Sequence, residues 1–182
     1  MAIEKHFFGD LELKTPKKRR QVHPKTWKED YRNAFGVEHI ADPKDVPKGD
    51  NVIFVTSCTG NKSDLPRGTA EQMYLSPLNQ RFYRDMKKAG VRYGTISGHL
   101  GIVFHDEEFD SYDSHTSEYQ YEEQFMMMGR LIEEKCKEKG IDTVVFCYSS
   151  PLMSEPFIKR LAYTDLKVYY ITKQSIIIDA NK

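Results

Sequence analysis

Short apolar runs alternate with amphipathic stretches along most of this chain. Residues 52–56 form an apolar run that is rich in β-branched side chains and follows Pro47 and Gly49, which predicts a buried strand. Comparable runs predict three further strands, at residues 91–97, 143–148 and 166–172. The stretches between them have helical spacing and predict helices at residues 77–89, 118–139 and 153–163.

Two of the predicted helices have further distinctive features. Ser76 is a candidate N-cap, Pro77 occupies the first helical position, and Gly90 is a candidate stop; the spacing places Leu78, Phe82 and Met86 on one face. In the longer helix, three consecutive methionines at residues 126–128 cannot share one face. We therefore expect at least one of them to be exposed or to meet a partner.

The order strand, helix, strand, helix, strand, helix, strand predicts the fold class. It is typical of an α/β three-layer sandwich with a mostly parallel central sheet, here of about four strands. We expect a single α/β domain over residues 50–182. Residues 175–178 are predicted to add a short strand, or a tail that docks on a partner subunit and supports a homo-oligomer.

Residues 1–49 differ from the remainder of the chain, and we interpret them as a basic N-terminal extension. A short helix is predicted from Thr26 to Phe35, ended by Gly36. The arm Lys17-Lys18-Arg19-Arg20 could contact RNA or a phosphate surface; a solvated tail is the alternative.

Composition narrows the class of protein. The 182 residues include 27 basic and 27 acidic ones, without the basic excess typical of nucleic-acid-binding proteins. The mean hydropathy is −0.64, and no apolar run approaches the roughly 18 residues of a membrane span. Three cysteines at no metal-ligand spacing and the absence of a secretory signal favour a reducing, cytoplasmic location. We expect no metal and no cofactor.

The loop after the first core strand is the sharpest candidate site. In parallel sheets, ligands bind beyond the carboxyl ends of the strands. Ser57 and Thr59 supply hydroxyls there, Gly60 allows close backbone approach, and Cys58 and Lys62 supply a thiol and an amine. Lys62 could bind a phosphate or carboxylate, or act as a nucleophile. The alternative is a buried cysteine at a strand end beside a solvated lysine.

Three further segments contribute candidate residues. Tyr74 and Ser76 precede the helix at residues 77–89, where free backbone amides favour an anionic group; packing and capping are the alternative roles. Ser97, His99 and Gly101 follow the second predicted strand. In the long acidic segment after them, the candidates for a general base or a ligand contact are Asp106, Tyr112 and Asp113. A solvated loop is the simpler interpretation of Glu107 and Glu108.

These residues occur in an order that resembles the domain-of-unknown-function family 6884. The shared series is Ser-Cys-x-x-x-Lys, then Tyr-x-Ser-Pro-Leu, then Ile-Ser-(small)-x-x-Gly-(aliphatic), then Asp and Tyr-Asp, and it covers about residues 50–150. In this chain the series is carried by Ser57, Cys58, Lys62, Tyr74, Ser76, Pro77, Leu78, Ile96, Ser97, Gly101, Ile102, Asp106, Tyr112 and Asp113. This resemblance supports the pairing of Cys58 with Lys62.

The first motif is also similar to one in the archaeosine synthase family of tRNA-modifying enzymes. There, a cysteine and a lysine four residues apart are followed closely by a tyrosine and a serine, and the surrounding domain is related in fold to uracil-DNA glycosylases. Cys58 and Lys62 match that spacing, whereas Tyr74 follows only after an insertion. The resemblance implies a pocket for a nucleobase or nucleotide.

Together these features favour an enzyme that acts on a nucleobase, nucleoside or nucleotide, free or within RNA, as a glycosidase or transferase. In this hypothesis Lys62 binds an anionic group or attacks as an amine, and Asp106 or Asp113 acts as the base or contacts the ribose. Two alternatives remain open: a non-catalytic nucleotide- or RNA-binding module, and an interaction protein that oligomerises through the methionine helix or its C-terminal tail.

Overall fold

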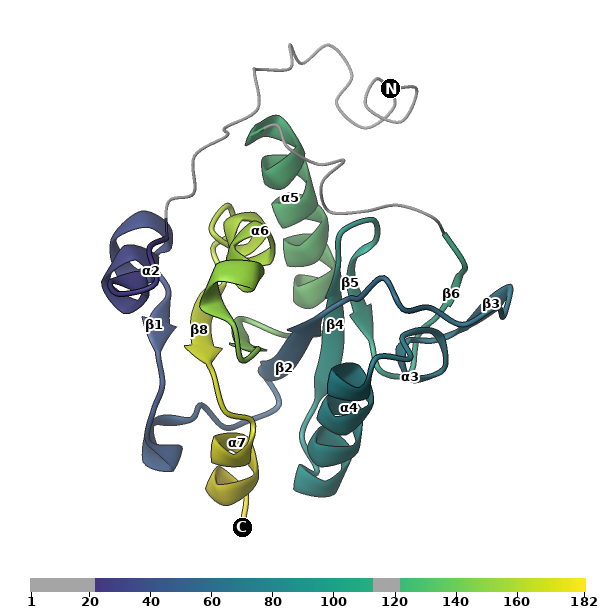
Figure 1. The fold of residues 1–182 in the computed structure, drawn as a ribbon, viewed down its shortest axis with the longest axis horizontal. Coiled ribbons are helices and arrows are strands. Elements are labelled where there is room, and N and C mark those ends of the chain that lie inside the picture. The colour runs from purple at the N-terminus through teal and green to yellow at the C-terminus, as the bar shows by residue number, and fades with distance from the viewer. Residues whose placement is uncertain (1–21, 113–121) are drawn as a thin grey trace.

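A six-stranded, mostly parallel sheet forms the centre of the molecule (Figure 1). A computed structural model describes residues 22–112 and 122–182. Five neighbouring strands are parallel, and the last strand runs antiparallel to its neighbour. In spatial order the strands are β1 (Glu38–His39), β8 (Lys167–Ile171), β7 (Thr143–Cys147), β2 (Val52–Ser57), β4 (Tyr93–Ser97) and β5 (Gly101–Phe104).

Helices cover both faces of this sheet, so the predicted α/β sandwich is confirmed. One face packs against α4 (Pro77–Ala89) and α7 (Ser175–Ala180). The other face packs against α2 (Trp27–Phe35), α5 (Glu122–Glu138) and α6 (Pro151–Leu161). Smaller elements are the 3-10 turn η1 (Pro43–Asp45), the helix α3 (Ala70–Met73) and an antiparallel pair of short strands, β3 (Arg67–Thr69) and β6 (Glu108–Asp110).

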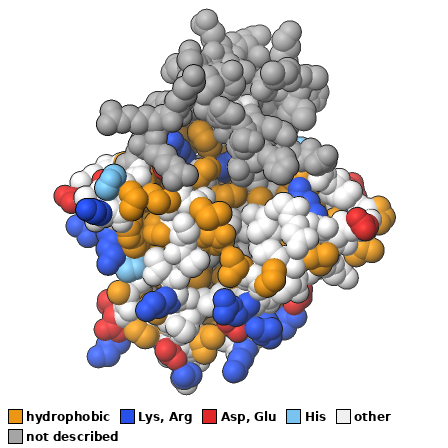
Figure 2. All heavy atoms as spheres, in the orientation of Figure 1, with side chains coloured by type: hydrophobic (Ala, Val, Ile, Leu, Met, Phe, Trp, Pro, Cys, Tyr) orange, Lys and Arg blue, Asp and Glu red, His pale blue; other side chains and the backbone are white. Residues whose placement is uncertain are grey.

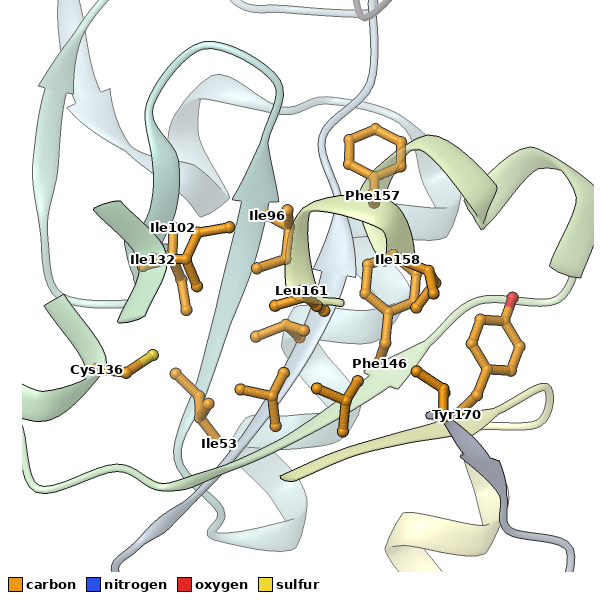
Figure 3. Close-up of a cluster of buried hydrophobic side chains, with 14 of the residues drawn as sticks. Ile53, Ile96, Ile102, Ile132, Cys136, Phe146, Phe157, Ile158, Leu161 and Tyr170 are labelled. Carbon is orange, nitrogen blue, oxygen red and sulfur yellow. The ribbon is translucent and has the colours of Figure 1, made fainter. Parts of the chain in front are cut away.

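The strand β2 lies in the middle of the core, with all six of its residues buried. Ile53 and Val55 belong to the apolar cluster on the α5 and α6 face, where Figure 3 shows Ile53 among side chains of several elements. Val52 and Phe54 belong to the cluster on the α4 face. Because alternate residues point to opposite faces, a strand covered on both sides must be apolar throughout, as this run is.

The predicted bounds of α4 are confirmed, and its buried face is rotated from the expected one. Gly90 ends the helix with φ at 68°, in the left-handed region that glycine tolerates best. Ser76 occupies the N-cap position, although its side chain makes no capping hydrogen bond. Leu78 is 44% exposed, which corrects its assignment to the core face. Asn79, together with Phe82 and Met86, is buried instead, because spacings of three and four both lie on one helical face.

Two other expectations are corrected. The segment after Ser97 is not one long loop, since it contains β5 and β6; β5 turns back beside β4 as a hairpin. The C-terminal residues form the helix α7 rather than a strand, and Ile177 is fully buried in the chain's own core. Short elements such as these leave little periodicity for sequence analysis to detect.

The second half of the predicted N-terminal extension packs onto the sheet. β1 pairs with β8, and the buried side chains of Tyr31 and Val37 join the main apolar cluster. The expected helix over residues 26–35 is confirmed and ends at Gly36 as predicted. The basic arm Lys17 to Arg20 lies outside the described residues.

A search of the described residues for membrane-spanning segments finds no helix that is both long enough and apolar enough to cross a bilayer.

Candidate functional site

The loop from Cys58 to Lys62 is held by backbone hydrogen bonds at both ends. Its first amide, that of Cys58, donates to the carbonyl of Ile96 in the neighbouring strand at 2.9 Å. At its far end, Lys62 forms an antiparallel bridge with Tyr74. The carbonyl of Asn61 accepts a hydrogen bond from the amide of Leu75 at 2.9 Å. These bonds bring the predicted residues Lys62 and Tyr74 together, although twelve positions separate them in the sequence.

A second loop reaches the same place from the other side of the fold. β6 pairs with β3, and the amide of Ser111 donates to the carbonyl of Pro66 at 2.9 Å. Across this pair, the guanidinium of Arg67 contacts the carboxylate of Asp110 at 2.9 Å. The small sheet thereby carries Tyr112 back to the loop that holds Lys62.

The amine of Lys62 lies against Tyr112. The Nζ atom is 3.8 Å from the centre of the phenol ring and donates to the backbone carbonyl of Tyr112 at 3.2 Å. A cation at this distance from an aromatic face is attracted by the ring's quadrupole. The imidazole of His99 also stacks on Tyr112, with ring centres 4.8 Å apart and planes inclined by 18°. Tyr112 therefore connects two of the other predicted residues.

Three hydroxyls form a chain below this aromatic group. The phenol oxygen of Tyr112 lies 2.5 Å from that of Tyr74 and 2.9 Å from the Ser97 hydroxyl. Ser97 accepts the backbone amides of His99 at 3.1 Å and Leu100 at 3.0 Å. A hydroxyl has two lone pairs and one proton, so Ser97 can accept these amides and also share a hydrogen bond with Tyr112, in which either oxygen can be the donor.

Burial keeps the phenols of Tyr74 and Tyr112 and the thiol of Cys58 protonated at neutral pH. It raises the pKa of Tyr74 and of Tyr112 well above the ordinary phenol value. Burial also raises the pKa of the Cys58 thiol, against the opposing effects of the Gly98 amide and the charges of Arg160 and Lys62. Cys58 is therefore a thiol in this state and a weak nucleophile.

Two small polar residues of the first loop occupy different environments. The carbonyl of Ser57 accepts from the buried amide of Asn79 at 2.9 Å, and Asn79 also donates to the Tyr83 hydroxyl at 3.2 Å. The hydroxyl oxygen of Thr59 is buried and has no hydrogen-bond partner within the described part of the chain. Most buried polar atoms in proteins are paired, so the Thr59 hydroxyl is an exception at this end of the sheet.

A depression of about 580 Å³ opens beside Lys62. Its lining includes the predicted residues Gly60, Lys62 and Tyr112. It also includes Asp64 and Ser111, which sequence analysis missed. Asp64 lies two positions after Lys62, so its closeness to the motif could have identified it as a site residue. No sequence pattern identifies Ser111, because its position depends on the pairing of β6 with β3.

Of the remaining predicted residues, those that the structure describes do not line the depression beside Lys62. Asp106 is exposed in the turn after β5, where the amide of His105 donates to the carbonyl of Tyr93 at the start of β4. Asp106 thus lies at the opposite end of the sheet, because β5 runs antiparallel to β4. Gly101 begins β5 with φ at 81°, and Ser76 is buried before α4. Asp113 lies outside the described residues.

A metal centre is not formed by the described side chains: across residues 22–112 and 122–182, no three His, Cys, Asp or Glu residues converge where they could hold an ion. Comparison with protein-family models, with curated proteins and with solved structures finds no match for this chain.

Proposed function

We propose that this chain is an enzyme that acts on a nucleobase, nucleoside or nucleotide, free or within RNA, and that Lys62 is its central binding residue. The observation that carries the proposal is the position of the Lys62 amine, 3.8 Å from the ring of Tyr112 and at the wall of an open depression. A cation beside a flat aromatic group suits a flat ligand that bears an anionic group or a carbonyl oxygen.

The neighbouring groups support a heterocyclic ligand. His99 and Tyr112 already stack, and planar bases stack on aromatic side chains with useful affinity. The resemblance to the archaeosine synthase family points to the same class of ligand.

The position of Asp106 changes which carboxylate we propose as the general base. Asp106 lies at the far end of the sheet, so we no longer assign it to this site. Asp64 borders the depression and replaces Asp106 as a candidate base. Asp113, which follows Tyr112 in the sequence, stays a second candidate. Ser57 ends β2 and Ser76 precedes α4; both are buried, and neither lines the depression.

A non-catalytic nucleotide-binding module is the second candidate. The protonated thiol of Cys58 favours it, because a neutral thiol does little covalent chemistry. If the basic arm adds RNA contacts, deletion of residues 1–25 should make RNA affinity less dependent on salt concentration.

The test is a thermal-shift and calorimetric screen with nucleobases, nucleotides and 7-deazaguanines, carried out on the wild type and on Lys62→Ala. We expect the variant to lose the response to ligand while its own free energy of unfolding changes by less than about 1 kcal/mol, the contribution of a partly exposed cation–π contact. Lys88→Ala, at an exposed position on α4, is the matched control.

A second variant separates the two roles of Lys62. Lys62→Arg keeps the positive charge and removes the amine, so binding without turnover would indicate that the amine reacts. Equal turnover by Lys62→Arg would assign Lys62 to charge alone. An unchanged ligand response in Lys62→Ala would contradict the proposal.

A further inference from the structure

A second cavity lies at the same end of the sheet, on the other side of β2. It has a volume of about 320 Å³ and is bordered by Thr56 of β2, by Cys147 and Tyr148 at the end of β7, and by the segment 172–175 that leads into α7. None of its lining residues belongs to the depression beside Lys62. The cavity is therefore a separate candidate binding site.

The cavity lies at the topological switch point of the sheet, where the connections from two adjacent parallel strands lead in opposite directions. From β2 the chain crosses through α4 to β4 on one side, whereas β7 crosses through α6 to β8 on the other. β2 and β7 are neighbours, with Val55 opposite Phe146, and their following helices cover opposite faces. The chain segments after these two strands diverge, which leaves a crevice where α/β proteins bind ligands.

The charges around the cavity favour an anion. Arg81 and Lys173 contribute two positive charges and Asp85 one negative charge, so the lining carries a net charge of +1. Within the described part of the chain neither cation makes an ion pair, whereas the Asp85 carboxylate accepts a hydrogen bond from Gln174 at 2.5 Å. Figure 2 shows several basic side chains on the lower half of the drawn face, in the region of α4 and α7.

The uncharged part of the lining suits a small polyol. Thr56, Ser149 and Thr172 contribute hydroxyls, and Phe82 with Ile178 contributes apolar wall. Arg81 and Asp85 are four positions apart on α4, so both side chains project from the same face of the helix. The volume is near the lower limit for ligand pockets, which admits a small metabolite and excludes a folded nucleic acid.

We propose that this cavity binds a sugar phosphate, with Arg81 and Lys173 on the phosphate and Asp85 with the neighbouring hydroxyls on the sugar. Guanidinium and ammonium groups are the usual protein ligands of a phosphate ester. The proposal stands independently of the function proposed for Lys62, because the two pockets share no lining residue.

Isothermal titration of the full chain with ribose 5-phosphate tests this assignment. We expect saturable binding that Arg81→Gln and Lys173→Gln each weaken by about tenfold or more, the usual loss for one charge-assisted hydrogen bond. Arg84→Gln, exposed on the same helix and outside the cavity, should bind like the wild type. Circular dichroism melting confirms that each variant is folded.

Two further comparisons make the result decisive. Asp85→Asn should weaken ribose 5-phosphate and should not weaken inorganic phosphate, since the loss of a negative charge favours an anion. Lys62→Ala should leave both unchanged even if it abolishes nucleobase binding. The proposal is overturned if the wild type shows no saturable binding, or if Arg81→Gln and Lys173→Gln bind as tightly as Arg84→Gln. Equal affinity for inorganic phosphate and ribose 5-phosphate would overturn the sugar half.

Discussion

The two ends of the central sheet carry similar polar residues and use them differently. At the amino end, Arg92 donates to the carbonyl of Asp50 at 2.6 Å and to that of Lys139 at 3.1 Å. Asp142 accepts from the side chains of Asn51 at 2.8 Å and Thr143 at 2.7 Å. These groups satisfy one another and connect the strands, which is a structural role.

At the carboxyl end, comparable groups are left without a hydrogen-bond partner in the described part of the chain, or border an open depression or cavity. The Thr59 hydroxyl has no partner within the described residues, Lys62 borders a depression, and Arg81 borders a cavity beside Lys173. Residue type alone therefore does not mark a functional site. Polar groups whose hydrogen-bonding capacity is left unused by the fold mark it better, because leaving them so has a cost that a ligand can offset.

The largest loss of stability is expected from Asn79, whose buried side chain supports the carboxyl end of β2. Asn79→Ala removes the buried amide that binds the Ser57 carbonyl and the Tyr83 hydroxyl. We expect the free energy of unfolding to fall by about 2 kcal/mol, because buried groups lose a partner. Urea denaturation measures the loss, and calorimetry should show weaker ligand binding beside Lys62.

Arg84→Ala is the control for that substitution, since Arg84 is exposed on the same helix. A fully stable Asn79→Ala variant with unchanged binding would show that the loop after β2 does not depend on α4.

A smaller effect is expected at the amino end, and it should be confined to stability. Arg92→Ala removes two hydrogen bonds to carbonyls that water can reach, so we expect a loss of about 1 kcal/mol in urea denaturation. Ligand binding at the carboxyl end should be unchanged. Weakened binding in this variant would contradict the division of roles between the two ends.

The smallest effect is a difference in pH dependence. Burial lowers the pKa of His39, at the carboxyl end of β1, below 6.5. Between the two pKa values the unfolded chain binds more protons, so the contribution of His39 to stability is complete above pH 6.5 and is lost as the pH falls through the folded pKa. Thermal melting of His39→Phe should show a weaker pH dependence in this range.

The amino end should respond only in stronger acid. Hydrogen bonds from Thr143 and Asn51 lower the pKa of Asp142 below 3.8. Its contribution to stability is therefore present above pH 3.8 and is lost as the pH falls through the folded pKa. Asp142→Asn should lower the melting temperature by a constant amount near pH 6, and the difference from the wild type should shrink as the pH falls below 3.8. A difference that varies with pH near pH 6 would contradict this assignment.

Local sequence patterns were enough to predict the main elements and the first loop of the site. Long periodic segments predicted α4 to the residue, and the apolar run of β2 placed Ser57, Cys58 and Lys62 at a strand end. These predictions succeed because burial on both faces and helical amphipathicity are local patterns that neighbouring residues carry together.

Which of these residues come into contact depends on strand pairing and helix packing. The pairing of β6 with β3 brings Tyr112 to Lys62, and the antiparallel β5 takes Asp106 to the far end of the sheet. The cavity between α4 and α7 joins Thr56, Arg81 and Lys173 from three separate segments. Strand pairing and helix packing are long-range contacts, and no local pattern in the sequence specifies which short strand finds which partner.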